Sequence, residues 1–126
     1  MMDKVEFLIL RNLLHNEEYV RKVIPFIKAD YFENYNEKVV FEETLKFVEE
    51  YNQPVTKEVL CIETEKRQDI NDTSFKEITQ LISGLDDEPT EFNWLVNTTE
   101  KWCRDRAIYL ALMESISLAD GKDETK

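Results

Sequence analysis

The side chains that most often bind metals or act as nucleophiles are few and widely spaced in this sequence of 126 residues. The single histidine, His15, has Asn12 three residues before it, where the Glu-x-x-His pattern of di-iron helical bundles needs a glutamate. Cys61 and Cys103 have no neighbouring cysteine or histidine, which favours free, buried thiols in a reducing compartment. We therefore predict no metal site and interpret His15 as a last-turn residue facing the helix dipole or solvent.

Acidic side chains are abundant but stand where general acid–base chemistry is not favoured. The pairs at 42–43 and 49–50 and the run at 86–88 fall on expected wet helix faces or in a turn. Neither Gly84 nor Gly121 belongs to the Gly-x-x-x-x-Gly-Lys pattern that cradles phosphates. No serine or cysteine pairs recognisably with the histidine. We predict no catalytic residue, no cofactor and no enzymatic activity of this chain.

Composition indicates one all-α domain. Hydrophobic residues make up 42% of the chain and charged residues 34%, which is typical of a globular protein with a sizeable core. Two glycines and three prolines are too few for the many corners of a β-sandwich or barrel. We therefore expect helices and no sheet.

The acidic balance argues against nucleic acid as a direct partner. Asp and Glu number 27 against 16 Lys and Arg, and the resulting net charge of -11 repels phosphate. The acidic N-terminal residues are unlike a signal peptide, and no run approaches the about 18 apolar residues of a membrane span. A cytoplasmic location without a membrane partner is expected, in the host bacterium if a phage encodes the chain.

Apolar spacing predicts a helical body over residues 1–70. Asn16 and Thr56 are suitable N-caps, and Pro25 ends the second helix at the residue before it. The predicted helices cover residues 4–15, 17–24, 36–51 and about 57–66. The expected core includes Phe7, Leu10, Phe26, Phe32, Phe41, Leu45 and Val48.

Residues 71–120 are predicted to form a long antiparallel helical hairpin. Ser74 and the glutamate three residues later have the form of a capping box, and Gly84 is a natural C-cap of that first helix. Thr90 can cap a second, longer helix that ends near Gly121. Residues 121–126 are then a tail or a linker.

The longer helix carries two apolar lines, and one short partner helix cannot cover both. Such a helix either packs into a larger core or holds a second chain. The candidate interface residues are Trp94, Leu95, Trp102, Tyr109, Leu112, Met113 and Ile116.

Several short motifs follow one another in a recognisable order. Asp30-Tyr31-Phe32 precedes a helix with Val40-Phe41, and the turn Asn52-Gln53-Pro54-Val55-Thr56 follows that helix. Together with the closing helices, this order resembles the N-terminal domain of DnaB-type replicative DNA helicases over about residues 5–118. Segments such as Leu81-Ile82-Ser83-Gly84-Leu85 are similar to the T-even-type phage branch. Bacterial members have a turn glycine where this chain has Asn52.

The resemblance implies a domain for protein interaction and assembly. Domains of this family associate through helical hairpins into a collar of dimers above a hexameric motor, and they engage primase. A helicase loader is a further expected partner. The motor domain that makes the full-length family ATP-dependent helicases is absent from this sequence, so the chain itself is expected to have no catalytic activity.

A different class of function is a small acidic phage protein that mimics DNA and inhibits a host DNA-binding protein. A net charge of -11 on a compact domain could imitate phosphates. Such a mimic needs a regular array of carboxylates on one face. Here Glu17 and Glu18 are followed by Arg21 and Lys22, and this mixing of signs weakens the alternative.

Overall fold

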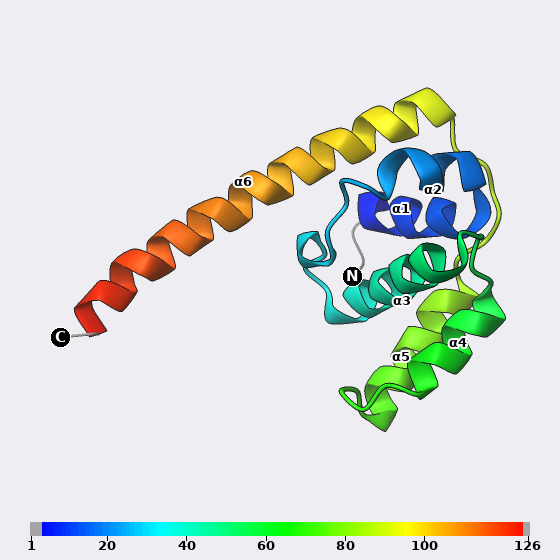
Figure 1. Cartoon of the computed structure of the whole chain (residues 1–126), viewed down its shortest axis with the longest axis horizontal. Coiled ribbons are helices and arrows are strands. Elements are labelled where there is room, and N and C mark those ends of the chain that lie inside the picture. The colour runs from blue at the N-terminus through cyan, green and yellow to red at the C-terminus, as the bar shows by residue number, and fades with distance from the viewer. Residues whose placement is uncertain (1–3, 125–126) are drawn as a thin grey trace.

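The computed structural model describes residues 4–124, with side chains for residues 5–119, and all regular elements in that range are helices (Figure 1). This confirms the prediction of an all-α fold. The elements are α1 (Lys4–His15), α2 (Glu17–Val23), the short 3-10 helix η1 (Ala29–Tyr31), α3 (Tyr35–Tyr51), α4 (Lys57–Glu65), α5 (Asp72–Ser83) and α6 (Phe92–Glu124). No helix in the described range is long and apolar enough to cross a membrane.

The helix boundaries in the first half follow from local capping. The side chain of Asn16 accepts a hydrogen bond from the Tyr19 amide at 3.0 Å, and Thr56 accepts one from the Val59 amide at 3.2 Å, which confirms both predicted N-caps. α3 ends at Asn52, whose φ of 53° is in the left-handed region that asparagine tolerates better than most residues.

The predicted capping box of α5 is wrong. α5 begins at Asp72, and the Asn71 side chain accepts a hydrogen bond from the Ser74 amide at 2.8 Å. Ser74 therefore lies inside the first turn rather than at the cap. The carboxylate of Glu77 accepts a hydrogen bond from Asn36 of α3 instead, at 3.1 Å.

The start of α6 also differs from the prediction. The carboxylate of Glu91 accepts hydrogen bonds from the amides of Asn93 and Trp94, at 3.2 and 2.8 Å, and so takes the capping role assigned to Thr90. At its other end α6 continues through Gly121 to Glu124, so the predicted tail at 121–126 is helical as far as it is described. Residues 125–126 lie outside the described part of the chain.

The core lies between α1, α2 and α3, with one side of each later helix packed against it. Ile9, Tyr19, Phe41, Ile78 and Leu95 are among its fully buried side chains. Of the predicted core residues, three are buried and four are only half-buried. The buried ones are Leu10, Phe32 and Phe41, and the half-buried ones are Phe7, Phe26, Leu45 and Val48.

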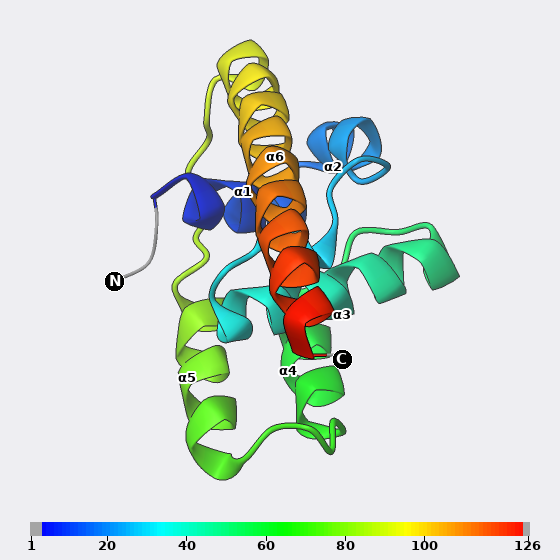
Figure 2. The same cartoon turned by 90° about the vertical axis from the view of Figure 1, so that its left-hand side faces the viewer.

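The predicted antiparallel hairpin of the last two helices is not formed. α5 packs against α3 and α4, whereas α6 packs against α1, α2 and η1. Two views agree that α5 lies at the far side of the body from the start of α6 (Figures 1 and 2). The physical reason is the connection between them, because Arg11 of α1 binds Asp86 at 3.2 Å and Thr90 at 3.0 Å. These contacts hold the connection against α1, so α6 begins at a distance from α5 and the two helices do not pair.

Candidate interaction surface

The first half of α6 is fixed to the body by buried side chains. Leu95 is 1% exposed and Thr99 is completely buried. The hydroxyl groups of Thr99 and Tyr19 are hydrogen-bonded at 2.6 Å, which joins α6 to α2. Burial raises the pKa of the Tyr19 phenol, so this group stays neutral. This half of α6 is therefore part of the core.

The attachment of α6 ends at η1. The ring centroids of Trp102 lie 6.0 Å from Tyr31 and 4.9 Å from Phe32. One turn later, the Nε of Arg106 donates a hydrogen bond to the Tyr31 carbonyl at 2.6 Å. Leu110 is the last half-buried residue, and residues 111–119 are all exposed. The rest of the helix projects away from the body (Figure 1).

The projecting part of α6 is apolar on its surface. Helical geometry, at about 100° per residue, gathers five large side chains within about 140° of the helix circumference. We call these residues the α6 stripe. They are Ile108, Tyr109, Leu112, Met113 and Ile116, each 45–59% exposed. From 107 to 119 the only charged residue is Glu114. This makes the α6 stripe a candidate interaction surface, because soluble monomers rarely leave large contiguous apolar areas in water.

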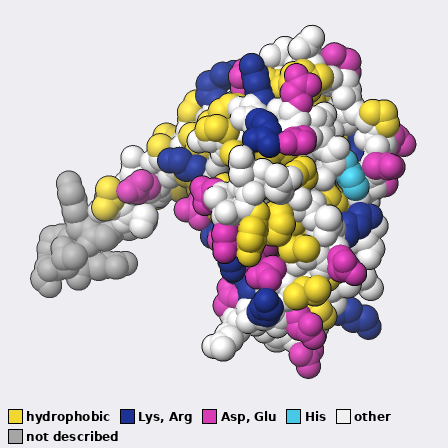
Figure 3. Space-filling view, turned by 45° about the vertical axis from the view of Figure 1, so that its right-hand side comes forward, with side chains coloured by type: hydrophobic (Ala, Val, Ile, Leu, Met, Phe, Trp, Pro, Cys, Tyr) yellow, Lys and Arg dark blue, Asp and Glu magenta, His cyan; other side chains and the backbone are white. Residues whose placement is uncertain are grey.

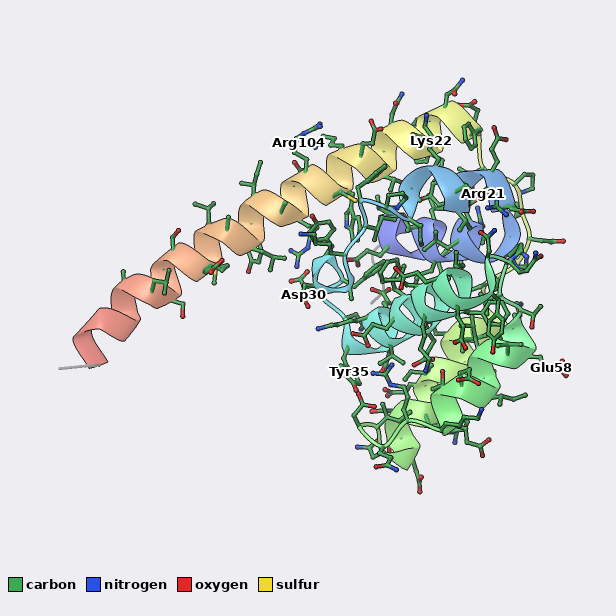
Figure 4. All side chains as sticks on the ribbon, in the orientation of Figure 1. Arg21, Lys22, Asp30, Tyr35, Glu58 and Arg104 are labelled. Carbon is green, nitrogen blue, oxygen red and sulfur yellow. The ribbon has the colours of Figure 1, made fainter. Side chains whose placement is uncertain are left out.

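Charges near the stripe are already neutralised or directed elsewhere. The Arg106 guanidinium lies 4.9 Å from the centre of the Tyr109 ring, a cation–π contact. Upstream on the same line of the helix, Lys101 and Asp105 form an ion pair at 2.8 Å. Arg104 points away from the body on another side of α6 (Figure 4). The stripe is thus an apolar surface without a strong field of either sign.

The structure separates the seven predicted interface residues into two groups. Leu95 is buried and Trp102 is half-buried, so these two hold α6 to the body. The other five are Trp94, Tyr109, Leu112, Met113 and Ile116, which are exposed. Trp94 lies on the same line of the helix as Leu112 but about 27 Å from it along the axis, beside the body.

Sequence reasoning missed two exposed residues of the projecting part. Ile108 is 55% exposed and belongs to the stripe, and Leu118 is 63% exposed on another side of the helix. Sequence alone could have placed Ile108 with the candidate interface residues, because it precedes Leu112 by one helical turn and Ile116 by two.

The histidine and the buried cysteine, whose side chains could bind a metal or act as nucleophiles, have structural roles instead. His15 is exposed in the last turn of α1, as predicted, and its Nε2 also donates a hydrogen bond to the Leu85 carbonyl at 2.8 Å. Burial, with a smaller effect from Glu100, raises the pKa of the Cys103 thiol to about 12, so little reactive thiolate forms. Both cysteines are free, but only Cys103 is buried as predicted, whereas Cys61 is half-buried. No group of three or more His, Cys, Asp or Glu side chains suited to a metal ion occurs among the described residues.

Comparison with known proteins agrees with the motif order. No family model matches the chain. A DnaB-like replicative helicase of Enterobacteria phage T4 is 31% identical to it over 111 residues, which are 88% of this chain and 23% of that protein. The chain therefore spans about a quarter of the length of the curated relative it matches. This similarity confirms the resemblance to a DnaB-type replicative helicase of the T-even phage type.

Proposed function

We propose that this chain is the protein-interaction and oligomerisation domain of a replicative DNA helicase, and that the α6 stripe is its assembly surface. The similarity to one quarter of a phage replicative helicase supports the replication role. The observation that carries the assembly role is the projecting part of α6, where residues 111–119 are all exposed. The domain would form part of a collar of dimers in a hexamer.

In the described chain, the projecting part of α6 lacks the packing partner that usually stabilises a helix. An isolated helical segment of this length is marginal in water, because its stability depends on packing of an apolar face. Full burial of one large apolar side chain contributes about 1.5–3 kcal/mol. Pairing of two α6 stripes would bury several such side chains on each copy, including Tyr109 and Leu112. Self-association is therefore the simplest way to stabilise the projecting part.

Primase is the second partner in this proposal, and a helicase loader is a third. The domain would act in the cytoplasm of the infected bacterium and would contribute contacts rather than catalysis. ATP hydrolysis would belong to the motor of the whole helicase, since this sequence has no phosphate-binding loop.

The alternative function, a DNA mimic, has weaker support. Many carboxylates are paired with cations of the same helix, including Glu17 with Arg21, Glu63 with Lys66 and Asp105 with Lys101. Paired charges of both signs make a poor imitation of an unbroken row of phosphates.

The test replaces Tyr109 and Leu112 together with glutamate, in the domain at high concentration and in the full helicase. We expect a folded variant with a lower mass in sedimentation and weaker primase binding in calorimetry. The matched control is Ala107→Glu with Ala111→Glu, which adds the same two charges to the opposite side of the same helix. A folded Tyr109→Glu/Leu112→Glu variant that keeps wild-type assembly and wild-type primase affinity would refute the proposal.

A further inference from the structure

A second apolar surface lies at the seam between α2 and the C-terminal half of α3. A cavity of about 250 Å³ is lined by Val20 of α2, Ile24 at its C-cap, Val48 of α3 and Pro54. This volume is below the about 300–1,000 Å³ of most small-molecule sites. One turn back along α3, Leu45 and Ala29 of η1 line a second depression, which is shallow and open and shares no lining residue with the cavity. We call this surface the seam groove.

Carboxylates dominate the rim of the seam groove. Glu49 and Glu50 stand beside it on α3, and no ion pair involves either of them within the described part of the chain. The nearby cations are already engaged. Lys46 lines the same depression as Glu49 and Glu50, but its ammonium group lies 3.7 Å from Glu43 and 3.8 Å from Glu63.

The remaining cation of the rim, Arg21, is also engaged. It is paired with Glu17 and donates a hydrogen bond to Asn52 at 3.2 Å, which places it across the mouth of the cavity. Figure 4 shows Arg21 on α2 at the end of the molecule where α3 finishes. The face seen in Figure 3 carries apolar patches between acidic and basic side chains. Within the described part of the chain, the charged side chains at the groove that have no ion-pair partner are therefore carboxylates.

We propose that the seam groove binds a basic amphipathic helix of another protein. Leu45 and Val48 lie one turn apart on α3, and Asn52 follows them at the C-cap, so the three span about 10 Å. That length fits apolar anchors at positions i, i+3 or i+4, and i+7 of a bound helix. Lysines or arginines along one edge of that helix would then lie against Glu49 and Glu50.

Charge complementarity excludes a second copy of this chain as the favoured occupant. The carboxylates at the rim of the groove repel a second copy, whose net charge is -11, at this surface. The exposed apolar helix of a second copy, 107–119, has Glu114 and no basic residue to face the rim. The seam groove is thus a docking surface separate from the α6 stripe, and its occupant has the opposite charge.

The test titrates the domain with a fluorescent amphipathic peptide of about 18 residues, in which leucines recur every three to four positions and lysines fill the rest. A matched peptide has glutamate in place of each lysine. We expect saturable binding of the basic peptide alone, with amide chemical-shift changes at α2 and α3. Glu49→Lys with Glu50→Lys should weaken binding about tenfold.

The control is Asp87→Lys with Glu88→Lys, which makes the same change of net charge on the exposed α5–α6 connection. This variant should bind the basic peptide within about twofold of wild type. If both variants lose the same affinity for the basic peptide, the peptide is attracted only by the net charge of the domain. That result would overturn the proposal. Three other results would also overturn it. They are loss of peptide binding in the Tyr109→Glu/Leu112→Glu variant, binding of the acidic peptide to the domain, and a changed mass of the Glu49→Lys/Glu50→Lys variant without peptide. The last result would assign the groove to a second copy.

Discussion

Arg67 shows how one side chain in a connection joins that connection to a helix. Its guanidinium lies 2.8 Å from Glu43, 3.0 Å from Glu42 and 2.7 Å from Asp69. Glu43 is buried, so its charge depends on this partner, whereas Asp69 is half in solvent. The hydrogen bond to Asp69 contributes most to a raised pKa of Arg67, which keeps the guanidinium charged. The contacts tie α3 to the chain between α4 and α5.

Replacement of Arg67 with methionine is expected to lower the free energy of unfolding by about 2–3 kcal/mol, because it leaves Glu43 buried without its main partner. Urea unfolding followed by circular dichroism measures this loss. The neighbouring change Lys66→Met is the control, since Lys66 is 67% exposed and contacts only Glu63 on the same helix. Its effect should stay within about 0.5 kcal/mol. An equal effect of both changes would contradict this role of Arg67.

Asp69 is expected to give the domain a measurable acid dependence. The hydrogen bond from Arg67 lowers the pKa of the Asp69 carboxyl from 3.8 to about 2. A group whose pKa is lower in the folded state stabilises the fold above its unfolded pKa, and this contribution disappears as pH falls from about 4 to 2. Asp69 is half-exposed, so the contribution is at most about 1 kcal/mol.

The measurement compares urea unfolding of wild type and Asp69→Asn between pH 5 and 2. We expect the wild type to be more stable above about pH 4 and the two curves to converge near pH 2. In the Arg67→Met background, Asp69→Asn should change the pH dependence much less, because the hydrogen bond from Tyr35 is then the main remaining interaction that lowers the pKa of Asp69. A constant difference at all pH values would show that Asp69 does not act through its charge.

At the scale of the elements, local signals predicted most boundaries and long-range contacts decided the rest. The caps Asn16 and Thr56 act within one helical turn, so sequence alone could identify them. The hairpin prediction failed because neighbouring helices usually pack together, and no local pattern revealed the contacts from Arg11 and His15 to the connection at 85–90.

The same limit applied to the candidate interface. Apolar periodicity identified the two lines of α6 but could not say which line the body covers. Burial of Leu95 and the ring contacts of Trp102 depend on α2 and η1, which are distant in sequence. The projecting part, by contrast, has no distant partner in the described chain, so its apolar spacing alone predicted most of the α6 stripe.

The two tryptophans of α6 provide a direct test of this division. Trp102→Ala should lower the free energy of unfolding by about 2–3 kcal/mol, because it removes ring contacts with Tyr31 and Phe32. Trp94→Ala should change it by less than about 1 kcal/mol, since Trp94 is 49% exposed. Thermal unfolding of both variants makes the comparison. A larger loss for Trp94 would show that the body covers the other line of α6.

For the whole molecule, the exposed α6 stripe and the largely buried apolar side chains of the seam groove differ in the charge around them and therefore in what they can bind. The α6 stripe has one carboxylate, Glu114, among thirteen residues at 107–119, so like-charge repulsion there is small despite the net charge of -11. The seam groove has unpaired Glu49 and Glu50 at its rim. Two copies can thus meet at the stripe while the groove stays open to a basic partner, and the same body can serve assembly and recruitment at once.

Assembly through the α6 stripe should appear as concentration-dependent protection of backbone amides. In dilute solution the amides of residues 111–119 are expected to exchange quickly with solvent, because a helix that projects without packing opens readily. At about a hundredfold higher concentration, pairing should slow their exchange by at least tenfold, or about 1.4 kcal/mol. Hydrogen exchange read by mass spectrometry measures the change, and the amides of α1 are the internal reference, since the α1 core residues Ile9 and Leu13 are buried at any concentration. The Tyr109→Glu/Leu112→Glu variant should show fast exchange at 111–119 throughout. If these amides are as protected as α1 in dilute wild-type protein, the projecting helix is stable without a partner and the stripe is not needed for its order.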